Sequence, residues 1–532
     1  MVSLTSADVP PAATPQYSDA QAAVTPDGRY VVFEGIYDGL VSSPVVSGGN
    51  SQIYLRDRVA GTTELISQST AGVPANNNDN DRPTISNDGC RVVFQSRATN
   101  LINGTVLSSS HVFLRDRCAL GGPKTTQVDV MPDGSPGLEQ ALQPRISGDG
   151  RTVVFTSYSD LVNGLTLHNG GACTGTPGYQ VVYLRHLDSN TTTALTRPDG
   201  GCIEGNEPDI SYDGTRIAFW AYDDLLNRSA SMWQIYLFDT SIGPSSLRYV
   251  SADKNGVPQR RNDGAHGGEG TSTVTAPAIS QDGRIVAFRS RGHGLWPNPL
   301  PLLGTDVASQ VYVKDTYTGT IVIASVDSTE NVLGNGNSSG GGQGYRPGLS
   351  ADGQYIVFRT EATNIASETG SGFVIHNNFF GGTSGLTNIP TNGFPELSPS
   401  GRFLTIHSGS ALDSRFTTRW GMFLLDIEIP FAPTLTKLTL VGRRITLDFT
   451  PSAISGAVLA NNYSALCEGS DGINQSATGT ASPLTVAGLK SGVTYICSVV
   501  AVSGSGDPSA YSNMLSKKVS IDLTPILMLL LD

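Results

Sequence analysis

One motif recurs seven times in the first 428 residues of this 532-residue chain, and it restricts the folds that the chain can adopt. A β-branched or other apolar residue precedes Ser/Thr-x-Asp-Gly, and an alternating apolar run that usually ends in Phe follows. The copies span residues 24–33, 85–94, 146–155, 210–219, 279–288, 349–358 and, in degenerate form, 397–406. Asp-Gly between two alternating runs indicates a β-hairpin, because glycine adopts the positive φ that a tight turn requires.

Each copy continues into a second hairpin. In the first copy its strands read Ile53-Tyr-Leu-Arg-Asp57 and Thr63-Glu-Leu-Ile-Ser67, and similar pairs follow most other copies. A propeller blade consists of four strands, so each copy corresponds to one blade. The chain is therefore predicted to be all-β, with a seven-bladed β-propeller over residues 1–428. We expect the Asp that ends each third strand, such as Asp57, to cap the next turn through its own backbone.

These strings resemble the repeat of the TolB-type propeller family, in which Pro-x-Ile-Ser-x-Asp-Gly precedes an apolar strand ending in Phe. Six of the seven copies keep Asp-Gly, and the seventh has Ser400-Gly401. The resemblance covers about four-fifths of the chain and implies the propeller fold. Members of this family serve as protein-docking platforms, enzyme accessory domains and lyases, so the resemblance leaves the function open.

The seventh copy lacks a fourth strand of its own, because the chain leaves the repeat after Asp426. Residues 2–6, Val-Ser-Leu-Thr-Ser, precede the first copy and have the pattern of that missing strand. We predict that residues 2–6 pair with the 417–426 strand and close the ring.

Residues 430–517 resemble an immunoglobulin-like sandwich of the fibronectin type III family. The resemblance rests on Ile445-Thr-Leu-Asp-Phe449, on Tyr463 and on Tyr495, which follows Gly-Leu-Lys-Ser-Gly. In that family a tyrosine at this place forms the tyrosine corner, and the domain usually acts as a spacer or a contact module.

The last residues, 518–532, form an apolar tail that is too short to span a bilayer. Three interpretations stay open: an extra strand on its own sandwich, the stub of an anchor segment, or a strand added to another subunit or partner. The third would make the tail a site of self-association.

The six cysteines fall into three sequence-local pairs: Cys90 with Cys118, Cys173 with Cys202, and Cys467 with Cys497. An even count without a CxxC motif predicts three disulfides and an exported protein that is periplasmic, extracellular or on the cell surface. No leader is visible at the start of the sequence, so we expect it to be absent from this chain. The net charge of −12 without a basic stripe argues against nucleic acid and anionic membranes as partners.

Propeller topology suggests where a site would lie. The insertions 34–50, 68–82, 97–110, 158–178, 252–275, 290–308 and 326–345 all belong to connections on one face, which we expect to bind a protein or glycan partner. Near the channel mouth on that face, the inner strands are predicted to place Gln21, Arg82, Gln143, Glu207, Ala276, Arg346 and Phe394. Such a polar ring would suit an anionic or sugar-like ligand, or its members bond to adjacent loops and water.

No nucleophile elbow, P-loop or paired-histidine motif is present, and no cofactor is indicated except Ca²⁺. Asp79 and Asp81 in an Asn-rich loop carry oxygen ligands for that ion but lack the EF-hand pattern. The favoured hypothesis is an exported, non-catalytic binding protein with the sandwich and tail as spacer or assembly module. The alternative is a polysaccharide-active lyase or hydrolase with its site at the channel mouth.

Overall fold

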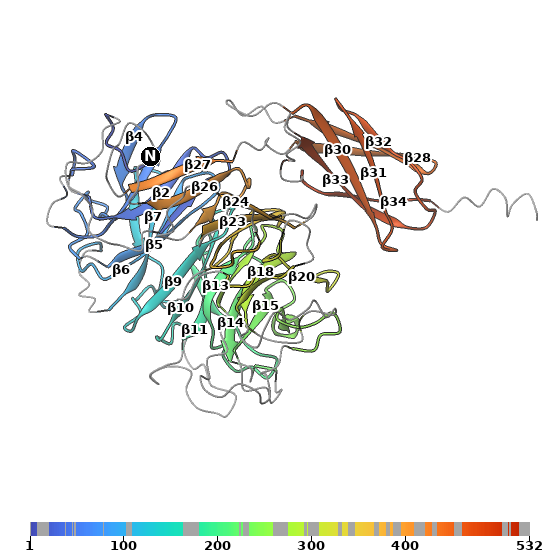
Figure 1. Ribbon diagram of the computed structural model, residues 1–532. Helices are drawn as coiled ribbons and strands as arrows, with labels where there is room; N and C mark the ends of the chain where they lie inside the picture. Colours follow the sequence, from blue (N-terminus) through green and yellow to red (C-terminus); the bar gives the residue numbers. More distant parts are fainter. Residues whose placement is uncertain are drawn as a thin grey trace, which may run out of the picture. The chain divides into compact units, whose positions relative to one another are not determined.

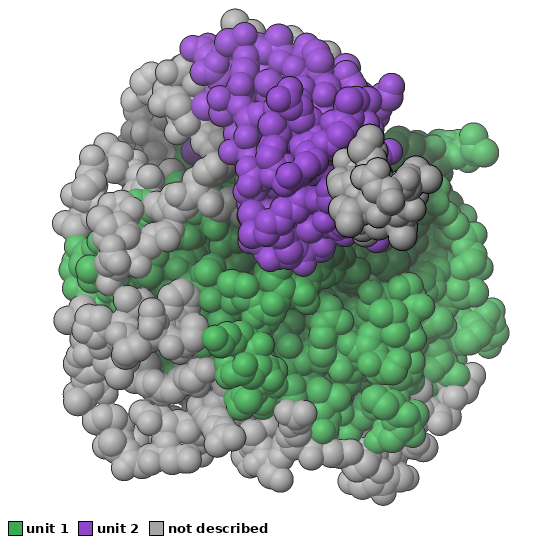
Figure 2. Space-filling model, turned by 90° about the vertical axis from the view of Figure 1, so that its right-hand side faces the viewer, with its two compact units in different colours: residues 1–399, 403–425 green, residues 400–402, 426–532 purple. Residues whose placement is uncertain are grey.

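The computed structural model contains almost only β-strands, with one short 3₁₀ helix, Pro244–Ser246, among the described residues (Figure 1). The structure describes residues 2–7, 21–37, 39–44, 46, 49–77, 79–102, 109–162, 180–222, 225–226, 233–258, 275–291, 295, 308–327, 332–338, 346–365, 372–378, 383–386, 395–408, 421–427, 433–451, 460–502, 509 and 512–520. The chain divides into two compact units. Unit 1 has residues 1–399 and 403–425, and unit 2 has residues 400–402 and 426–532 (Figure 2).

The first half of unit 1 forms three antiparallel sheets, each of four strands in sequence order. The strands are β1 (Ala22–Val24), β2 (Tyr30–Gly35), β3 (Gln52–Asp57) and β4 (Thr62–Leu65); β5 (Asn80–Ile85), β6 (Arg91–Ser96), β7 (His111–Asp116) and β8 (Lys124–Gln127); β9 (Ala141–Ile146), β10 (Thr152–Ser157), β11 (Val181–His186) and β12 (Thr191–Ala194).

The second half continues with three more four-stranded sheets and one of three strands among the described residues. They are β13 (Asn206–Ile210), β14 (Arg216–Tyr222), β15 (Trp233–Asp239) and β16 (Arg248–Tyr249); β17 (Thr275–Ile279), β18 (Ile285–Ser290), β19 (Gln310–Asp315) and β20 (Ile321–Ile323); β21 (Gly348–Leu349), β22 (Tyr355–Thr360), β23 (Gly372–Asn377) and β24 (Thr383–Leu386); β25 (Glu396–Leu397), β26 (Phe403–Ser408) and β27 (Gly421–Asp426).

The first strand of every sheet contacts the first strand of the next sheet, and β25 contacts β1. The sheets therefore stand in a closed ring with β1, β5, β9, β13, β17, β21 and β25 innermost. This is the arrangement of blades in a β-propeller.

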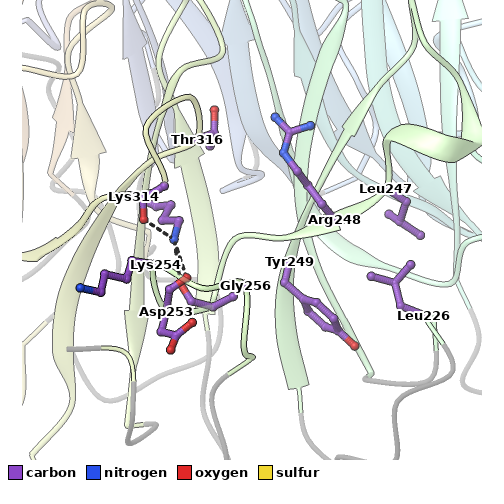
Figure 3. A pocket seen from close by; sticks show the side chains of 11 residues that line it. Leu226, Leu247, Arg248, Tyr249, Asp253, Lys254, Gly256, Lys314 and Thr316 are labelled. Carbon is purple, nitrogen blue, oxygen red and sulfur yellow. Dashed lines mark hydrogen bonds between the residues drawn. The ribbon is translucent and has the colours of Figure 1, made fainter. Parts of the chain in front are cut away.

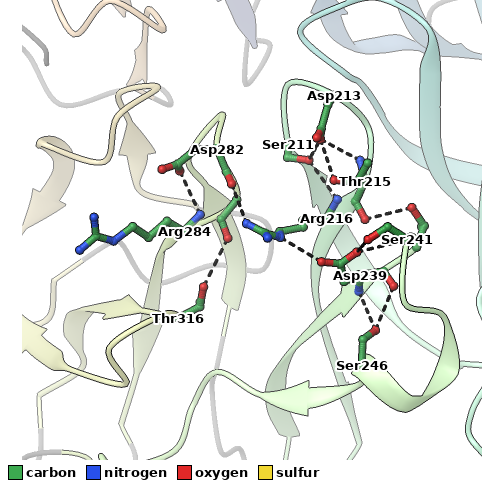
Figure 4. Close-up of polar contacts among 12 residues, drawn as sticks. Ser211, Asp213, Thr215, Arg216, Asp239, Ser241, Ser246, Asp282, Arg284 and Thr316 are labelled. Carbon is green, nitrogen blue, oxygen red and sulfur yellow. Dashed lines mark hydrogen bonds and ion pairs between the residues drawn. The ribbon is translucent and has the colours of Figure 1, made fainter. Parts of the chain in front are cut away.

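The Ser-x-Asp-Gly motif builds the turn between the first two strands of a sheet through a small hydrogen-bond set (Figure 4). Ser211 Oγ donates to Asp213 Oδ1 at 2.7 Å, and the Thr215 N–H donates to the same oxygen at 3.0 Å. The Arg216 N–H then donates to Ser211 Oγ at 3.0 Å. Equivalent bonds recur in the turns that begin at Thr25, Ser86, Ser147, Ser280 and Ser350.

The Asp that ends the third strand caps the following turn, as the sequence predicts, and also binds an arginine. Asp239 Oδ1 accepts the Ser241 N–H at 3.0 Å, while Oδ2 accepts Arg216 Nε at 3.1 Å (Figure 4). Asp57, Asp116 and Asp315 make the same two kinds of contact. Each such pair ties the second strand of a sheet to the end of the third.

The Phe that ends six of the seven motifs lies in the hydrophobic layer between sheets. Its ring stacks on an aromatic ring of the third strand at centroid distances of 5.8–6.0 Å in five sheets: Phe33–Tyr54, Phe94–Phe113, Phe155–Tyr183, Phe219–Tyr236 and Phe288–Tyr312. These rings are nearly all fully buried, so the repeated Phe marks the core of the propeller.

Backbone hydrogen bonds also join the Asp-Gly turns of neighbouring sheets. They run from Asn87 to Gly148, Asp149 to Tyr212, Tyr212 to Gln281, Gln281 to Ala351 and Ala351 to Pro399. At the equivalent places on either side of the β1–β4 sheet stand Pro26 and Pro399, which have no N–H to donate. The described ring of bonds is therefore interrupted on both sides of this sheet.

The N-terminal residues contact the last strand of the ring. The Val2 N–H donates to Met422 O at 2.7 Å, and the Met422 N–H donates to Ser3 Oγ at 3.1 Å. In the first sheet, Ile66, Ser67 and Ile53 make the same set, with Ile66 N–H to Ile53 O and Ile53 N–H to Ser67 Oγ. Residues 2–6 thus repeat the end of a fourth strand, although they form a bend and turn and not the regular strand that the sequence pattern suggests.

Side chains of the first sheet hold the same N-terminal residues from the other side. Arg56 Nη1 donates to Thr5 O at 2.9 Å, and the Thr63 N–H donates to Ser6 Oγ at 3.1 Å. Val2 and Leu4 are 2% and 5% exposed. Residues 2–4 are therefore buried, and Val2 packs with residues of the first sheet and with Met422 of the last.

Unit 2 contains a sandwich of two sheets around one core. One sheet has β28 (Thr434–Val441), β29 (Arg444–Thr450) and β32 (Leu484–Val486), and the other has β31 (Asn474–Gly479), β30 (Asn462–Gly469), β33 (Thr494–Val502) and β34 (Leu515–Lys518). Tyr495 is fully buried, and its hydroxyl accepts the Lys490 N–H, five residues upstream, at 3.1 Å. This is the geometry of a tyrosine corner.

Val519 lies within the predicted tail but is fully buried and bonds to Val493 O through its N–H. The sandwich therefore extends at least one residue into the segment that begins at 518, while residues 521–532 lie outside the described residues. No described helix is long and apolar enough to cross a membrane.

Two predicted disulfides are present. Cys90–Cys118 joins the turn before β6 to the turn after β7, with Cα atoms 5.3 Å apart, and Cys467–Cys497 joins directly opposite residues of β30 and β33. Cys202 is also disulfide-bonded. Cys173, with which it is predicted to pair, lies outside the described residues.

Candidate functional site

The two faces of the propeller carry connections of very different length. Every connection between the first and second strands spans five residues: 25–29, 86–90, 147–151, 211–215, 280–284, 350–354 and 398–402. Between the second and third strands the connections are 36–51, 97–110, 158–180, 223–232, 291–309, 361–371 and 409–420. Because the strands are antiparallel, the short turns and the long connections lie at opposite ends of the sheets. We call these ends the short-turn face and the long-loop face.

Three of the predicted channel-mouth residues have a left-handed backbone at equivalent places of adjacent inner strands. Arg82, Gln143 and Glu207 have φ of 52°, 59° and 47° in β5, β9 and β13. The pairing of each strand with its neighbour is shifted at this point. Such a bulge turns a side chain out of the regular alternation, and non-glycine residues tolerate it only where surrounding contacts hold them.

These three side chains contact one another. Arg82 Nη1 lies 2.8 Å from Glu207 Oε2, and Gln143 Nε2 donates to Glu207 Oε1 at 3.1 Å. Gln143 Oε1 accepts the Glu207 N–H at 2.8 Å. The predicted ring members are therefore bonded to each other across three sheets.

Three further charged residues, none of them predicted from the sequence, join them. Arg145, Asp209 and Glu396 each follow a predicted position by two residues in the sequence. Arg346 Nη1 is 3.2 Å from Asp209 Oδ1, and Arg145 Nη1 is 3.6 Å from Glu396 Oε1. The recurrence of a charged residue two positions after a predicted one was the signal that could have found them. We call Arg82, Gln143, Arg145, Glu207, Asp209, Arg346 and Glu396 the inner-strand cluster.

Burial and pairing set the ionisation of this cluster. Burial alone would raise the pKa of Glu207, but Arg82, Arg346 and Arg145 outweigh it and lower the pKa. Burial raises the pKa of Glu396, and burial together with the charge of Arg346 lowers the pKa of Arg145. Glu207 is thus more firmly ionised than Glu396.

The cluster contains three arginines and three carboxylates, so its formal charge is balanced. Arg82 and Arg346, which the sequence offered as an anion grip, are each paired with a carboxylate. Asp209 Oδ2 also accepts the Ile279 N–H of the next sheet at 2.9 Å. In this state the cluster holds neighbouring sheets together and leaves little uncompensated charge for a ligand.

The other predicted site residues lie apart from these contacts. The carbonyl of Gln21 accepts the Glu34 N–H at 3.0 Å, and Ala276 is fully buried. Phe394 lies outside the described residues.

The predicted calcium ligands have other surroundings. Asp79 Oδ2 pairs with Arg97 Nη1 at 3.1 Å, and burial raises the pKa of Asp81 to about 6. Among the described residues, no three His, Cys, Asp or Glu side chains are grouped as a metal site.

A pocket of about 500 Å³ lies between the outer strands of two neighbouring sheets (Figure 3). Arg248, Tyr249 and Lys314 line it, and Lys314 Nζ donates to Ala252 O and Gly319 O at 2.9 and 2.8 Å. Lys314 is therefore engaged with backbone carbonyls. None of the predicted site residues lines this pocket.

The ring of sheets around a polar cluster places unit 1 among the β-propeller proteins. No protein-family model matches the chain, and no curated protein matches it. Among solved structures, the chain is similar to TolB from Acinetobacter baumannii, with 15% identity over 80% of this chain and 77% of that chain and a TM-score of 0.33.

Two other solved structures are similar to parts of the chain. An oligogalacturonate lyase from Vibrio parahaemolyticus is 13% identical over 76% of this chain and 89% of that chain, with a TM-score of 0.42. The twitchin kinase region from C. elegans is 20% identical over 18% of this chain and 17% of that chain, with a TM-score of 0.16.

Proposed function

We propose that this chain is an exported seven-bladed propeller protein whose long-loop face docks a protein or glycan partner. The observation that carries the proposal is the one-sided distribution of the connections, with five-residue turns at one end of every sheet and long loops at the other. A rigid scaffold that varies its loops on one face uses that face for recognition.

The seven-blade assignment rests on the seven sheets of unit 1 and on the N-terminal residues, which take the place of the last strand of the seventh. The fibronectin type III-like assignment of unit 2 rests on its three- and four-stranded sheets and on the Tyr495 corner. We assign unit 2 the role of spacer or assembly module.

Export is supported by the disulfides Cys90–Cys118 and Cys467–Cys497, since such bonds persist in oxidising compartments. The second candidate, a polysaccharide-active enzyme at the channel mouth, has less support than the first. Arg82 and Arg346 are paired with Glu207 and Asp209, so they no longer offer an open grip for an acidic polymer.

Photo-crosslinking from matched surface positions tests which face docks the partner. A photoreactive amino acid would replace Val73 or Val257 on the long-loop face, and Val59 or Leu120 on the short-turn face. All four side chains are apolar and exposed, at 50%, 40%, 77% and 105%. In the exported fraction of producing cells we expect crosslinked species from the first pair only. Equal crosslinking from both faces, or crosslinking from the second pair alone, would contradict the proposal.

A glycan array tests for a glycan partner. The full chain is compared on the array with the variants Val73→Glu, on the long-loop face, and Val59→Glu, on the short-turn face. Loss of glycan binding in the first variant and retention in the second is expected. Loss in the second alone would place the site on the short-turn face.

A further inference from the structure

A serine, a histidine and an aspartate of the second sheet are aligned in series. Ser109 Oγ lies 3.0 Å from His111 Nε2, and His111 Nδ1 lies 2.6 Å from Asp129 Oδ2. His111 and Asp129 are fully buried, whereas Ser109 is half-buried. Ser109 precedes β7, and Asp129 follows β8, so the group belongs to the long-loop end of the third and fourth strands and not to the inner-strand cluster.

Other sheets show what the fold itself needs at these places. The pair that corresponds to His111 and Asp129 is Gln52 and Ser67 in the first sheet, Gln234 and Ser251 in the fourth, and Gln310 and Ser325 in the fifth. In each, the serine hydroxyl donates to the glutamine and accepts a backbone N–H of the third strand.

In the second sheet Asp129 Oδ1 accepts the matching N–H of Val112 at 3.0 Å. The structural role is thus fulfilled by either pair, and Gln–Ser fulfils it without any ionisable group. The residue two before the glutamine is Asn50, Met232 or Ala308, and only the second sheet among these four has serine there. A hydroxyl, an imidazole and a carboxylate therefore replace three other residues together.

The order of contacts is that of a nucleophile, its base and the group that orients the base. A serine hydroxyl bonded to Nε2 of a histidine whose Nδ1 faces a buried carboxylate is activated for attack on an acyl carbon, whatever the fold that carries it. The half-buried Ser109 is the member of the three that a substrate reaches, and burial shields the imidazole and carboxylate from water.

We propose that Ser109, His111 and Asp129 form an acyl-transfer site that hydrolyses carboxylic esters. Ser109 Oγ bonds to the ester carbonyl carbon while His111 Nε2 takes its proton, and the same nitrogen returns that proton to the departing alcohol as the ester C–O bond breaks. Water then attacks the acyl-serine, His111 takes a proton from the water and gives it to Ser109 Oγ, and a carboxylic acid leaves. Asp129 is a positioning residue, because it touches only the histidine of this set.

The test uses the full chain and a fluorophosphonate probe, which labels activated serines, with the labelled peptide located by mass spectrometry. We expect labelling at Ser109 and turnover of p-nitrophenyl acetate. Both should be lost in Ser109→Ala and should be retained in Ser110→Ala, whose hydroxyl is buried and has no hydrogen bond among the described residues.

The decisive variant is His111→Gln combined with Asp129→Ser, which installs the pair found in the other sheets. Its tryptophan-fluorescence unfolding midpoint should match that of the parent, while labelling and ester turnover fall by at least about tenfold. Absence of label on Ser109 in the folded parent, or equal labelling in this double variant, would overturn the proposal. Neither result depends on the partner of the long-loop face.

Discussion

Replacing Arg82 with methionine should destabilise the propeller by about 3 kcal/mol. The substitution removes the 2.8 Å ion pair with Glu207, whose side chain is only 7% exposed. Breaking a buried pair from one side costs about 3–5 kcal/mol, because the remaining charge stays buried. The lower end applies here, since Arg82 is 27% exposed and Gln143 still donates to Glu207. At about 2 °C per kcal/mol for a large domain, the midpoint should fall by about 6 °C.

The pH dependence should change sign in this variant. In the parent the folded-state pKa of Glu207 lies below the ordinary value of 4.5, so its contribution is present above that pH and is lost as pH falls through the folded pKa. Without Arg82 the effect of burial prevails and raises the pKa. Protonation then favours the folded state, and the stability difference between variant and parent should shrink as pH falls from 7 toward 4.5.

Tryptophan fluorescence reports on the unfolding of unit 1 alone, because the four tryptophans of the chain all belong to that unit: Trp220, Trp233, Trp296 and Trp420. Arg82→Met combined with Glu207→Gln removes both charges and should recover most of the loss. A loss below about 1 kcal/mol in the single variant, or a difference that stays constant from neutral to acid pH, would refute the buried-pair reasoning.

Three smaller perturbations test other parts of the fold. Val2→Asp places a charge in a side-chain site that is 2% exposed and should lower the tryptophan-monitored midpoint by several degrees; an unchanged midpoint would mean that the N-terminal residues do not hold the ring. Gly28→Ala must displace the Phe403 ring, which lies 2.4 Å from the new Cβ, whereas Gly39→Ala has the same backbone strain in open space. Urea unfolding should therefore show a loss for Gly28→Ala that exceeds the loss of about 1 kcal/mol for Gly39→Ala, and equal losses would contradict the packing argument. Tyr495→Phe removes the hydroxyl bonded to Lys490 N–H and should cost unit 2 about 1 kcal/mol by calorimetry, with no effect on the tryptophan signal.

Much of the fold could be predicted from local sequence. Ser-x-Asp-Gly specifies the turn almost completely, since the hydroxyl and the carboxylate make three hydrogen bonds within six residues and the glycine adopts the positive φ. The bond of residues 2 and 3 to Met422 could be anticipated from a missing fourth strand. Both inferences need only strand order and the count of strands per repeat.

The contacts of the site residues were beyond such reasoning. Arg82 reaches Glu207 past Gln143, from the second sheet to the fourth, because strands that are distant in sequence converge at the axis. The sequence shows the residue types on each inner strand but not which charges neutralise each other. A search for charged residues two positions after each predicted one would have added Arg145, Asp209 and Glu396 to the prediction.

The serine–histidine–aspartate group was missed for a different reason. No local spacing motif links the two, because an entire strand, β8, separates Asp129 from the strand that contains His111. Aligning the repeats and asking where one copy departs from Gln and Ser would have singled out this sheet. In a repetitive protein, the departures between copies are as informative as the repeat.

The contact between the N-terminal residues and β27 has a consequence for the order in which the protein folds during synthesis. The bond between Val2 and Met422 joins residues at opposite ends of unit 1, so Val2 is synthesised before every strand of unit 1 yet is among the last of its residues to find a partner. Until β25, β26 and β27 have all emerged, the β1–β4 sheet lacks its complete neighbour on one side, and the Val2 N–H lacks its partner Met422 O. A nascent chain that stops short of β27 should therefore keep its local hairpins yet expose an apolar edge. The protease sensitivity of the nascent chain should therefore drop abruptly once unit 1 is complete.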